Sequence, residues 1–331
     1  MGDGIRIGFQ VWGQAVAWPE LMEAGRAIEA HGYASLWAND HFYPIAGDGA
    51  GLVTGHDGPV FEAWLTLAGW AAVTERLTLG CLVAGAGYRN PGLLVKMATT
   101  LDHASGGRAV LGLGAGWHER EHRAFGFAYP PLRERLDRFE ETATVVRQLL
   151  DGEAVTFAGR WVTLDGARND PPPLQGRLPL LIGGSGERRT LPLAARLADA
   201  WNGEGDPAIY GRLARLLDDR CADARRDPGS LVRSVGLPPV CIRDSREAAV
   251  EALAATLARH ARSRSDARAW AAASPFADTA ERVTGLLRAY ADAGAGEAIF
   301  DWPAPFDGET LDRLADVAER LRPVGARGGE S

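Results

Sequence analysis

The feature of this sequence that most constrains its fold is a regular alternation of short apolar runs with longer amphipathic stretches. Eight runs have the length and composition of buried parallel strands: residues 5–10, 35–39, 77–83, 108–113, 178–183, 199–202, 234–242 and 297–301. Each precedes a helical pattern: residues 19–31, 61–73, 91–103, 131–150, 188–197, 207–226, 246–260 and 308–321. Eight consecutive strand–helix pairs predict a closed (β/α)8 barrel.

The chain has 331 residues, which exceeds the roughly 250 of a plain barrel. We expect the surplus to form a β-hairpin at 154–164, a glycine-rich loop at 42–59 and extra helices within 261–290. The sequence predicts one domain over residues 1–322 and a frayed tail over 323–331. The alternative is a doubly wound open sheet with a cap domain. No linker or composition shift divides the chain, which favours the barrel.

Composition narrows the range of partners. The net charge is −7 and the pI is about 5.6, so phosphate backbones and anionic membranes attract the chain poorly. The sequence begins without a signal peptide and has no apolar run of the ~20 residues that a membrane span needs. Cys81, Cys221 and Cys241 show no CxxC spacing, which suits a reducing compartment. We therefore expect a soluble cytoplasmic protein that acts on a small molecule.

In a barrel, chemistry belongs at the carboxyl ends of the strands. Asp40 and His41 end the second predicted strand, and a histidine beside a carboxylate can handle a proton near neutral pH. Residues 112–117 (GLGAGW) join a strand to a helix, and their glycines would let a flat ring lie against backbone. The other interpretation of this segment is a plain tight turn.

A second glycine-rich segment, residues 183–186 (GGSG), also joins a strand to a helix. Its small residues expose the N–H groups of a helix N-terminus, and Ser185 with Arg188 or Arg189 could complete an anion site. The alternative is an ordinary turn that Ser185 caps.

Residues 118–122 (HEREH) match the HExxH pattern of zinc hydrolases, in which His118 and His122 would hold the metal. The run lacks a third ligand downstream, and charged residues of this kind also form a solvated first helical turn. We expect no metal here, and keep zinc hydrolysis as an alternative.

Several blocks together resemble the luciferase-like monooxygenase superfamily, and within it the oxidoreductases that depend on the deazaflavin coenzyme F420. The blocks are residues 35–42 (SLWANDHF), 77–126, the hairpin and 178–202. The resemblance implies a deazaflavin at the strand ends, a strand-three bulge with a non-proline cis peptide bond, a homodimer and the following cofactor-site residues: Asp40, Cys81, Leu82, Ala115, Gly116, Gly183 and Gly184. The two glycine-rich segments themselves add Trp117, Ser185 and Gly186 to the predicted cofactor contacts.

The sequence also departs from its sugar-phosphate branches, which carry a glutamate at the position of Trp117 and use lysines, whereas no lysine follows Lys96 here. We predict hydride transfer between F420 and a small, fairly apolar substrate. His41 would handle the proton, Asp40 would orient His41 or polarise the ring, and the 42–59 loop would exclude water. The alternatives are an FMN-dependent monooxygenase supplied by a separate reductase, and a non-catalytic flavin-binding protein.

Overall fold

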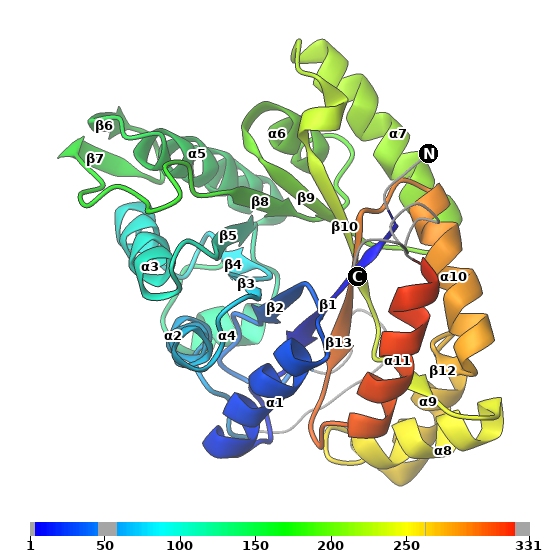
Figure 1. Ribbon diagram of the computed structural model, residues 1–331. Helices are drawn as coiled ribbons and strands as arrows, with labels where there is room; N and C mark the ends of the chain where they lie inside the picture. Colours follow the sequence, from blue (N-terminus) through cyan, green and yellow to red (C-terminus); the bar gives the residue numbers. More distant parts are fainter. Residues whose placement is uncertain (1–3, 46–57, 262, 322–331) are drawn as a thin grey trace, which may run out of the picture.

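A ring of parallel strands organises the molecule. The computed structural model describes residues 4–45, 58–261 and 263–321, and within these ranges eight parallel strands close into a barrel because β3 pairs with both β2 and β5 (Figure 1). In ring order these strands are β1 (Arg6–Val11), β2 (Ser35–Ala38), β3 (Thr78–Cys81), β5 (Ala109–Gly114), β8 (Leu180–Gly183), β9 (Ala200–Gly203), β10 (Val232–Leu237) and β13 (Glu297–Trp302). The predicted (β/α)8 barrel is confirmed.

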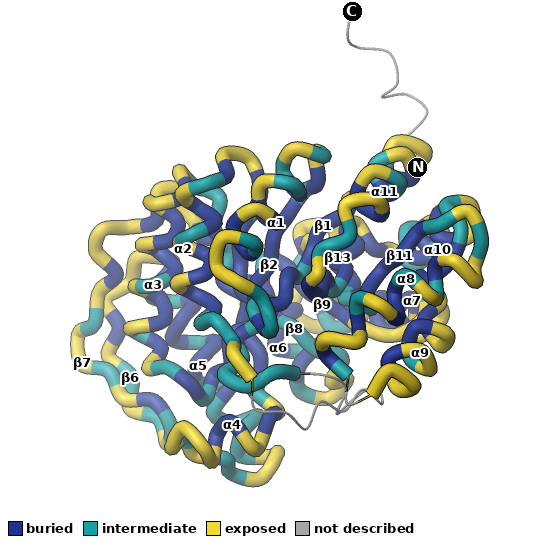
Figure 2. The backbone as a smooth tube through the Cα atoms, turned by 90° about the horizontal axis from the view of Figure 1, so that it is seen from below, coloured by how far each residue is buried: buried dark blue, intermediate teal, exposed yellow. Residues whose placement is uncertain are grey.

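Helices surround the ring and turn their apolar sides toward it, so burial is concentrated inside and exposure outside (Figure 2). They are α1 (Trp18–Ala30), α2 (Ala63–Val73), α3 (Pro91–Ala104), α4 (Glu119–Ala124), α5 (Leu132–Leu150), α6 (Thr190–Leu197), α7 (Pro207–Asp223), α8 (Arg246–Leu257), α9 (Arg264–Ala273), α10 (Ala280–Asp292) and α11 (Gly308–Leu321). None of these helices has the length and apolar character that crossing a membrane requires.

The predicted hairpin is confirmed: β6 (Val155–Ala158) and β7 (Thr163–Ala167) pair antiparallel and project beside α5 (Figure 1). The extra segment before β13 holds α9 and α10, as expected. Residues 46–57 of the predicted loop and the predicted tail, 323–331, lie outside the described residues.

The prediction of one strand over residues 234–242 is wrong. β10 ends at Leu237, where Pro238 and Pro239 lack the N–H groups that a sheet ladder needs. The next residues form β11 (Cys241–Ile242), which pairs with β12 (Ala277–Asp278) in a separate small sheet beside α8 and α9.

The interior of the barrel is filled by side chains that alternate along the strands. Its apolar centre consists of Trp37, Leu82, Leu181, Ala200 and Ile299. Side chains two residues apart point to the same side of a strand. The residues two positions beyond this apolar centre therefore also point inward, at the mouth formed by the carboxyl ends of the strands. The core therefore supports the site directly from below.

The bulge between β3 and β4 (Ala84–Gly85) requires glycine on the neighbouring strand. A Cβ atom at Gly112 would overlap the carbonyl oxygen of Cys81 and lie 3.3 Å from Cγ1 of Val83. Backbone atoms cannot rotate away, so a side chain at this position has to displace the bulge.

We therefore expect Gly112→Ala to destabilise the protein by roughly 1–3 kcal/mol, measured by urea denaturation. Gly285→Ala is the matched control, since no atom lies within 4 Å of its added methyl group and the position is inside α10. This control should be stabilised by about 0.5–1 kcal/mol. Equal midpoints for the two variants would contradict the close approach at Gly112.

Candidate active site

The residues predicted to form the site gather on one arc of the barrel mouth. They lie at the carboxyl ends of β2, β3, β5 and β8, which are neighbours in the ring. His41 follows β2, Leu82 follows β3, Trp117 follows β5 and Ser185 follows β8. The structure thus places side by side four segments that are far apart in the sequence.

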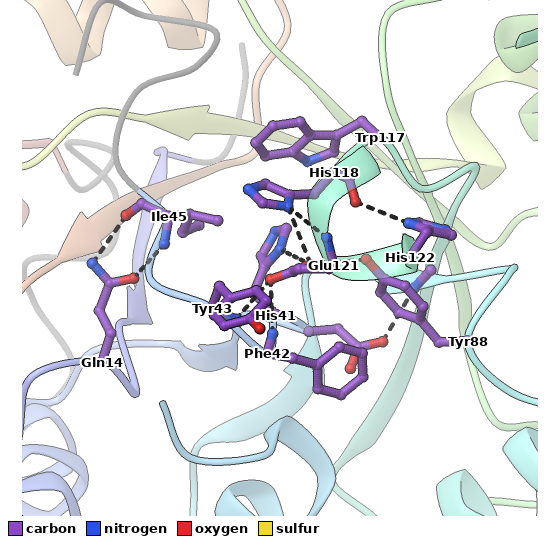
Figure 3. A network of polar contacts seen from close by, with 12 residues as sticks. Gln14, His41, Phe42, Tyr43, Ile45, Tyr88, Trp117, His118, Glu121 and His122 are labelled. Carbon is purple, nitrogen blue, oxygen red and sulfur yellow. Dashed lines mark hydrogen bonds and ion pairs between the residues drawn. The ribbon is translucent and has the colours of Figure 1, made fainter. Parts of the chain in front are cut away.

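His41 is held by a buried carboxylate that the sequence did not single out. Its Nδ1 lies 2.9 Å from Oε2 of Glu121, whose side chain is fully buried (Figure 3). Oε1 accepts hydrogen bonds from the backbone N–H groups of Phe42 and Tyr43, at 2.8 and 2.9 Å, and the Tyr88 hydroxyl donates to Oε2 at 2.9 Å. One carboxylate on α4 therefore fixes the histidine and the backbone that follows it.

These hydrogen bonds determine the protonation of Glu121. Burial alone would raise its pKa, but the hydrogen bonds and charge of His41, with the two backbone N–H groups, outweigh burial and lower the pKa to about 2. An ionised Glu121 keeps the proton of His41 on Nδ1. Nε2 is then the nitrogen of His41 that can exchange a proton with a bound molecule.

We expected Asp40 to orient His41, but the carboxylate of Asp40 has other partners. Its carboxylate binds Arg89 in bidentate fashion, at 2.6 and 2.9 Å, and accepts the Gly85 N–H at 3.2 Å. Arg89 also contacts Glu62 at 2.6 Å. The two adjacent side chains therefore reach different partners.

The bulge after β3 contains the non-proline cis peptide bond that the resemblance implies. It lies between Leu82 and Val83, one residue beyond the Cys81–Leu82 pair. The Gln10 side chain donates a hydrogen bond to the Leu82 carbonyl. The Cys81 side chain is completely buried, and burial raises the pKa of its thiol, so only backbone atoms of this residue can serve a ligand.

The turn after β5 presents an aromatic face to the mouth. Gly116 has a φ of +74°, and its carbonyl, like that of Trp117, is held by a side chain from the following segment. The Trp117 side chain is half exposed, and its ring packs edge-on against His41 with centroids 5.5 Å apart. A molecule that reaches His41 therefore passes this indole.

The turn after β8 contains a polar group, the Ser185 hydroxyl, that is available to a ligand. Ser185 does not cap α6; the N-cap is Arg189, whose guanidinium pairs with Asp137 and Glu140. The Ser185 hydroxyl is buried without a partner among the described residues, and Arg188 is exposed and makes no ion pair with them. Gly184 has a φ of +122°, which only glycine adopts readily. These features fit an anionic group better than a purely structural turn.

The HExxH run does not form a metal site within the described residues. His118 caps α4 by accepting the Glu121 N–H, and His122 Nδ1 bonds to the His118 carbonyl at 3.0 Å (Figure 3). The alternative of a solvated first turn is also wrong for Glu121 and His122, which are buried. The useful signal in this run was its second acidic residue, Glu121, shortly after a glycine-rich strand end.

A further carboxyl group lies at the end of β13. Asp301 Oδ1 accepts the indole N–H of Trp12 at 3.0 Å, and Asp301 is in register with Gln10 of β1. Burial raises its pKa to about 7, although the Trp12 hydrogen bond acts in the opposite direction. In the sequence, Asp301 is distinguished only by its place at the carboxyl end of the predicted strand 297–301.

Comparison with known proteins agrees with this geometry. The luciferase-like monooxygenase profile matches residues 5–320, and the chain belongs to this family. The F420-dependent glucose-6-phosphate dehydrogenase of Nakamurella multipartita is 34% identical over 224 residues, which are 67% of this chain and 61% of that protein. The enzyme of the same name from Rhodococcus erythropolis is 27% identical over 364 residues and covers 98% of this chain and 100% of its own.

Solved structures of similar shape include an F420-dependent secondary alcohol dehydrogenase in complex with an F420–acetone adduct. Its TM-score is 0.79 at 20% identity, covering 97% of this chain and all of that chain. The F420-dependent tetrahydromethanopterin reductase of Methanopyrus kandleri has a TM-score of 0.78 at 17% identity, with the same coverage. These likenesses establish the fold.

The ionised state of Glu121 makes stability depend on pH. Its folded pKa lies below the usual 4.5, so its contribution is complete above about pH 4.5 and disappears as the pH falls toward 2. We expect Glu121→Gln to lower the free energy of unfolding by roughly 3 kcal/mol at pH 7, and by much less at pH 3, in urea titrations.

Glu119→Gln provides the control, since Glu119 is exposed on the same helix and its ion pair is with Arg123, which is also exposed. It should change stability little at either pH. A pH-independent loss in Glu121→Gln would show that the carboxylate is not ionised in the folded protein.

Proposed function

We propose that this protein is an F420-dependent oxidoreductase that moves a hydride between the deazaflavin and a small organic substrate. The observation that carries the proposal is the His41–Glu121 pair, set at the barrel mouth on the same arc as the two glycine-rich turns. Curated relatives named F420-dependent dehydrogenases, one of them aligned along nearly the whole chain, support the choice of cofactor.

The residues present fit a flat ring with an anionic tail. The backbone at Leu82 and from Ala115 to Gly116 offers surface for the ring, while the 183–186 turn offers Ser185 Oγ to the tail. In a deazaflavin, carbon replaces the flavin N5, so this cofactor supplies hydride transfer and not oxygen activation.

The protein's own task is to position groups and to handle a proton. Glu121 keeps the proton on Nδ1 of His41, so Nε2 can accept a proton from a substrate hydroxyl or return one to a carbonyl oxygen. Trp117 covers one side of His41 and limits the water that reaches it. Asp40, paired with Arg89, stabilises the strand ends beneath, and we assign it a positioning role.

We do not extend the relatives' sugar-phosphate substrate to this chain. No lysine follows Lys96, and the wall near His41 is aromatic: Phe42, Tyr43, Trp117 and Phe125 gather there. Such a wall favours an apolar substrate.

We also propose that the protein forms a homodimer and that a separate reductase serves its cofactor. Light scattering tests the homodimer.

Cofactor titration followed by absorbance tests the proposal. We expect F420 to bind, and Ser185→Ala to weaken it about tenfold through the loss of one hydrogen bond to a charged group. The same variant should bind the tail-less deazaflavin chromophore as the parent protein does. FMN binding without F420 binding would favour the monooxygenase alternative.

Turnover separates the enzyme from a mere binding protein. His41→Asn should lower kcat about 10²-fold or more in F420 reduction by a panel of secondary alcohols, while F420 affinity stays unchanged. Bound F420 that no alcohol or carbonyl compound converts would favour the non-catalytic alternative.

A further inference from the structure

Asp301 lies deep in the mouth, on the arc opposite the glycine-rich turns. It faces inward, because Ile299, two residues earlier on β13, belongs to the apolar centre of the barrel. The residue keeps part of its surface exposed, although protein atoms crowd its carboxyl group enough to raise the pKa to about 7. The carboxyl group is therefore partly accessible from the mouth.

Within residues 4–45, 58–261 and 263–321, no basic side chain pairs with this carboxyl group. Its one partner among the described residues is the Trp12 indole, which satisfies Oδ1 and leaves Oδ2 without a donor. The chain at the ends of β9, β10 and β13, residues 200–206, 235–240 and 299–304, contains no lysine or arginine. The charge of Glu204 also raises the pKa of Asp301 and adds to the negative potential.

The other two buried carboxylates of the mouth are fully engaged. Asp40 is neutralised by Arg89, and Glu121 has four donors. Buried carboxyl groups in proteins are paired in this way because an isolated one is costly. Asp301 departs from the rule at the place where the opposite wall already offers a cofactor site.

We infer that Asp301 is the substrate-recognition residue of this site, and that it binds a substrate through a hydroxyl or amino donor on a molecule without anionic groups. This inference rests on the proposed function, since it locates the substrate across the mouth from the cofactor. A donor from the substrate would complete the hydrogen bonding of Oδ2.

Glu204 extends the same preference. A Cβ added at Gly236 would lie 4.0 Å from Cγ of Glu204, so the stem of this side chain lies over the inward face of β10. In a cleft, charges of one sign act together on an incoming molecule. Phosphate and carboxylate substrates are therefore repelled on this arc, whereas neutral alcohols and cationic amino alcohols are accepted.

Three small alcohols that share one skeleton test this inference directly. They are 2-butanol, 1-amino-2-propanol and lactate, which are neutral, cationic and anionic versions of a methyl carbinol. Saturation-transfer NMR would measure their binding with and without F420. We expect 1-amino-2-propanol to bind about tenfold more tightly than lactate, with 2-butanol between them.

Asp301→Asn keeps the oxygen that accepts from Trp12 but cannot carry a charge. It should bring the ratio of the two charged probes close to one, and Glu204→Gln should reduce the ratio less because Glu204 is exposed. Asp165→Asn on the exposed hairpin is the matched control and should leave the ratio unchanged.

Equal signals for the three probes, including no signal from any, would overturn the assignment, as would a preference that survives Asp301→Asn in a folded variant. Weaker F420 binding in that variant would place Asp301 in the cofactor site and also overturn it. Failure of the parent protein to bind F420 would instead refute the proposed function. The probe ratios measured on the free protein would still test the role of Asp301.

Discussion

The carboxylate of Glu121 joins more of this site than any other group. It lies on the short helix α4, yet its donors come from the segment after β2 and from Tyr88 before α3. A fully buried charge is tolerated only when such donors surround it. The energetic demand of one ion therefore fixes the direction of His41 and the backbone path beside it.

The segment after β2 is fixed again at its far end. Gln14 donates to the Ile45 carbonyl at 2.9 Å and accepts the Ile45 N–H at 2.8 Å (Figure 3). The side-chain amide thus makes the two hydrogen bonds that a neighbouring strand would make. Because Gln14 also contacts His260, the position of this segment depends on the inserted region beyond α8. Remote elements thus contribute to the rim of the mouth.

The fold could be predicted because it rests on periodic patterns, which survive in a single sequence. The exception is residues 234–242, an apolar run that two prolines divide because they lack the N–H groups of a sheet ladder. The site was predicted less well, since pairing depends on direction as well as on proximity. Asp40 adjoins His41 in the chain, but its carboxylate binds Arg89, and the carboxylate that His41 needs comes from 80 residues away.

The three carboxyl groups of the mouth show how environment assigns different tasks to one functional group. Arg89 turns Asp40 into a structural ion pair, and backbone N–H groups turn Glu121 into an anchor for an imidazole. From the described part of the chain Asp301 receives only an indole N–H, and burial raises its pKa to about 7. A fold that satisfies two such groups completely and a third only in part has the third available for a molecule that enters from outside. In the proposed function the two arcs therefore have opposite tasks: the glycine-rich arc would offer donors to an anionic tail, and the β9–β10–β13 arc would offer acceptors to a donor-bearing substrate.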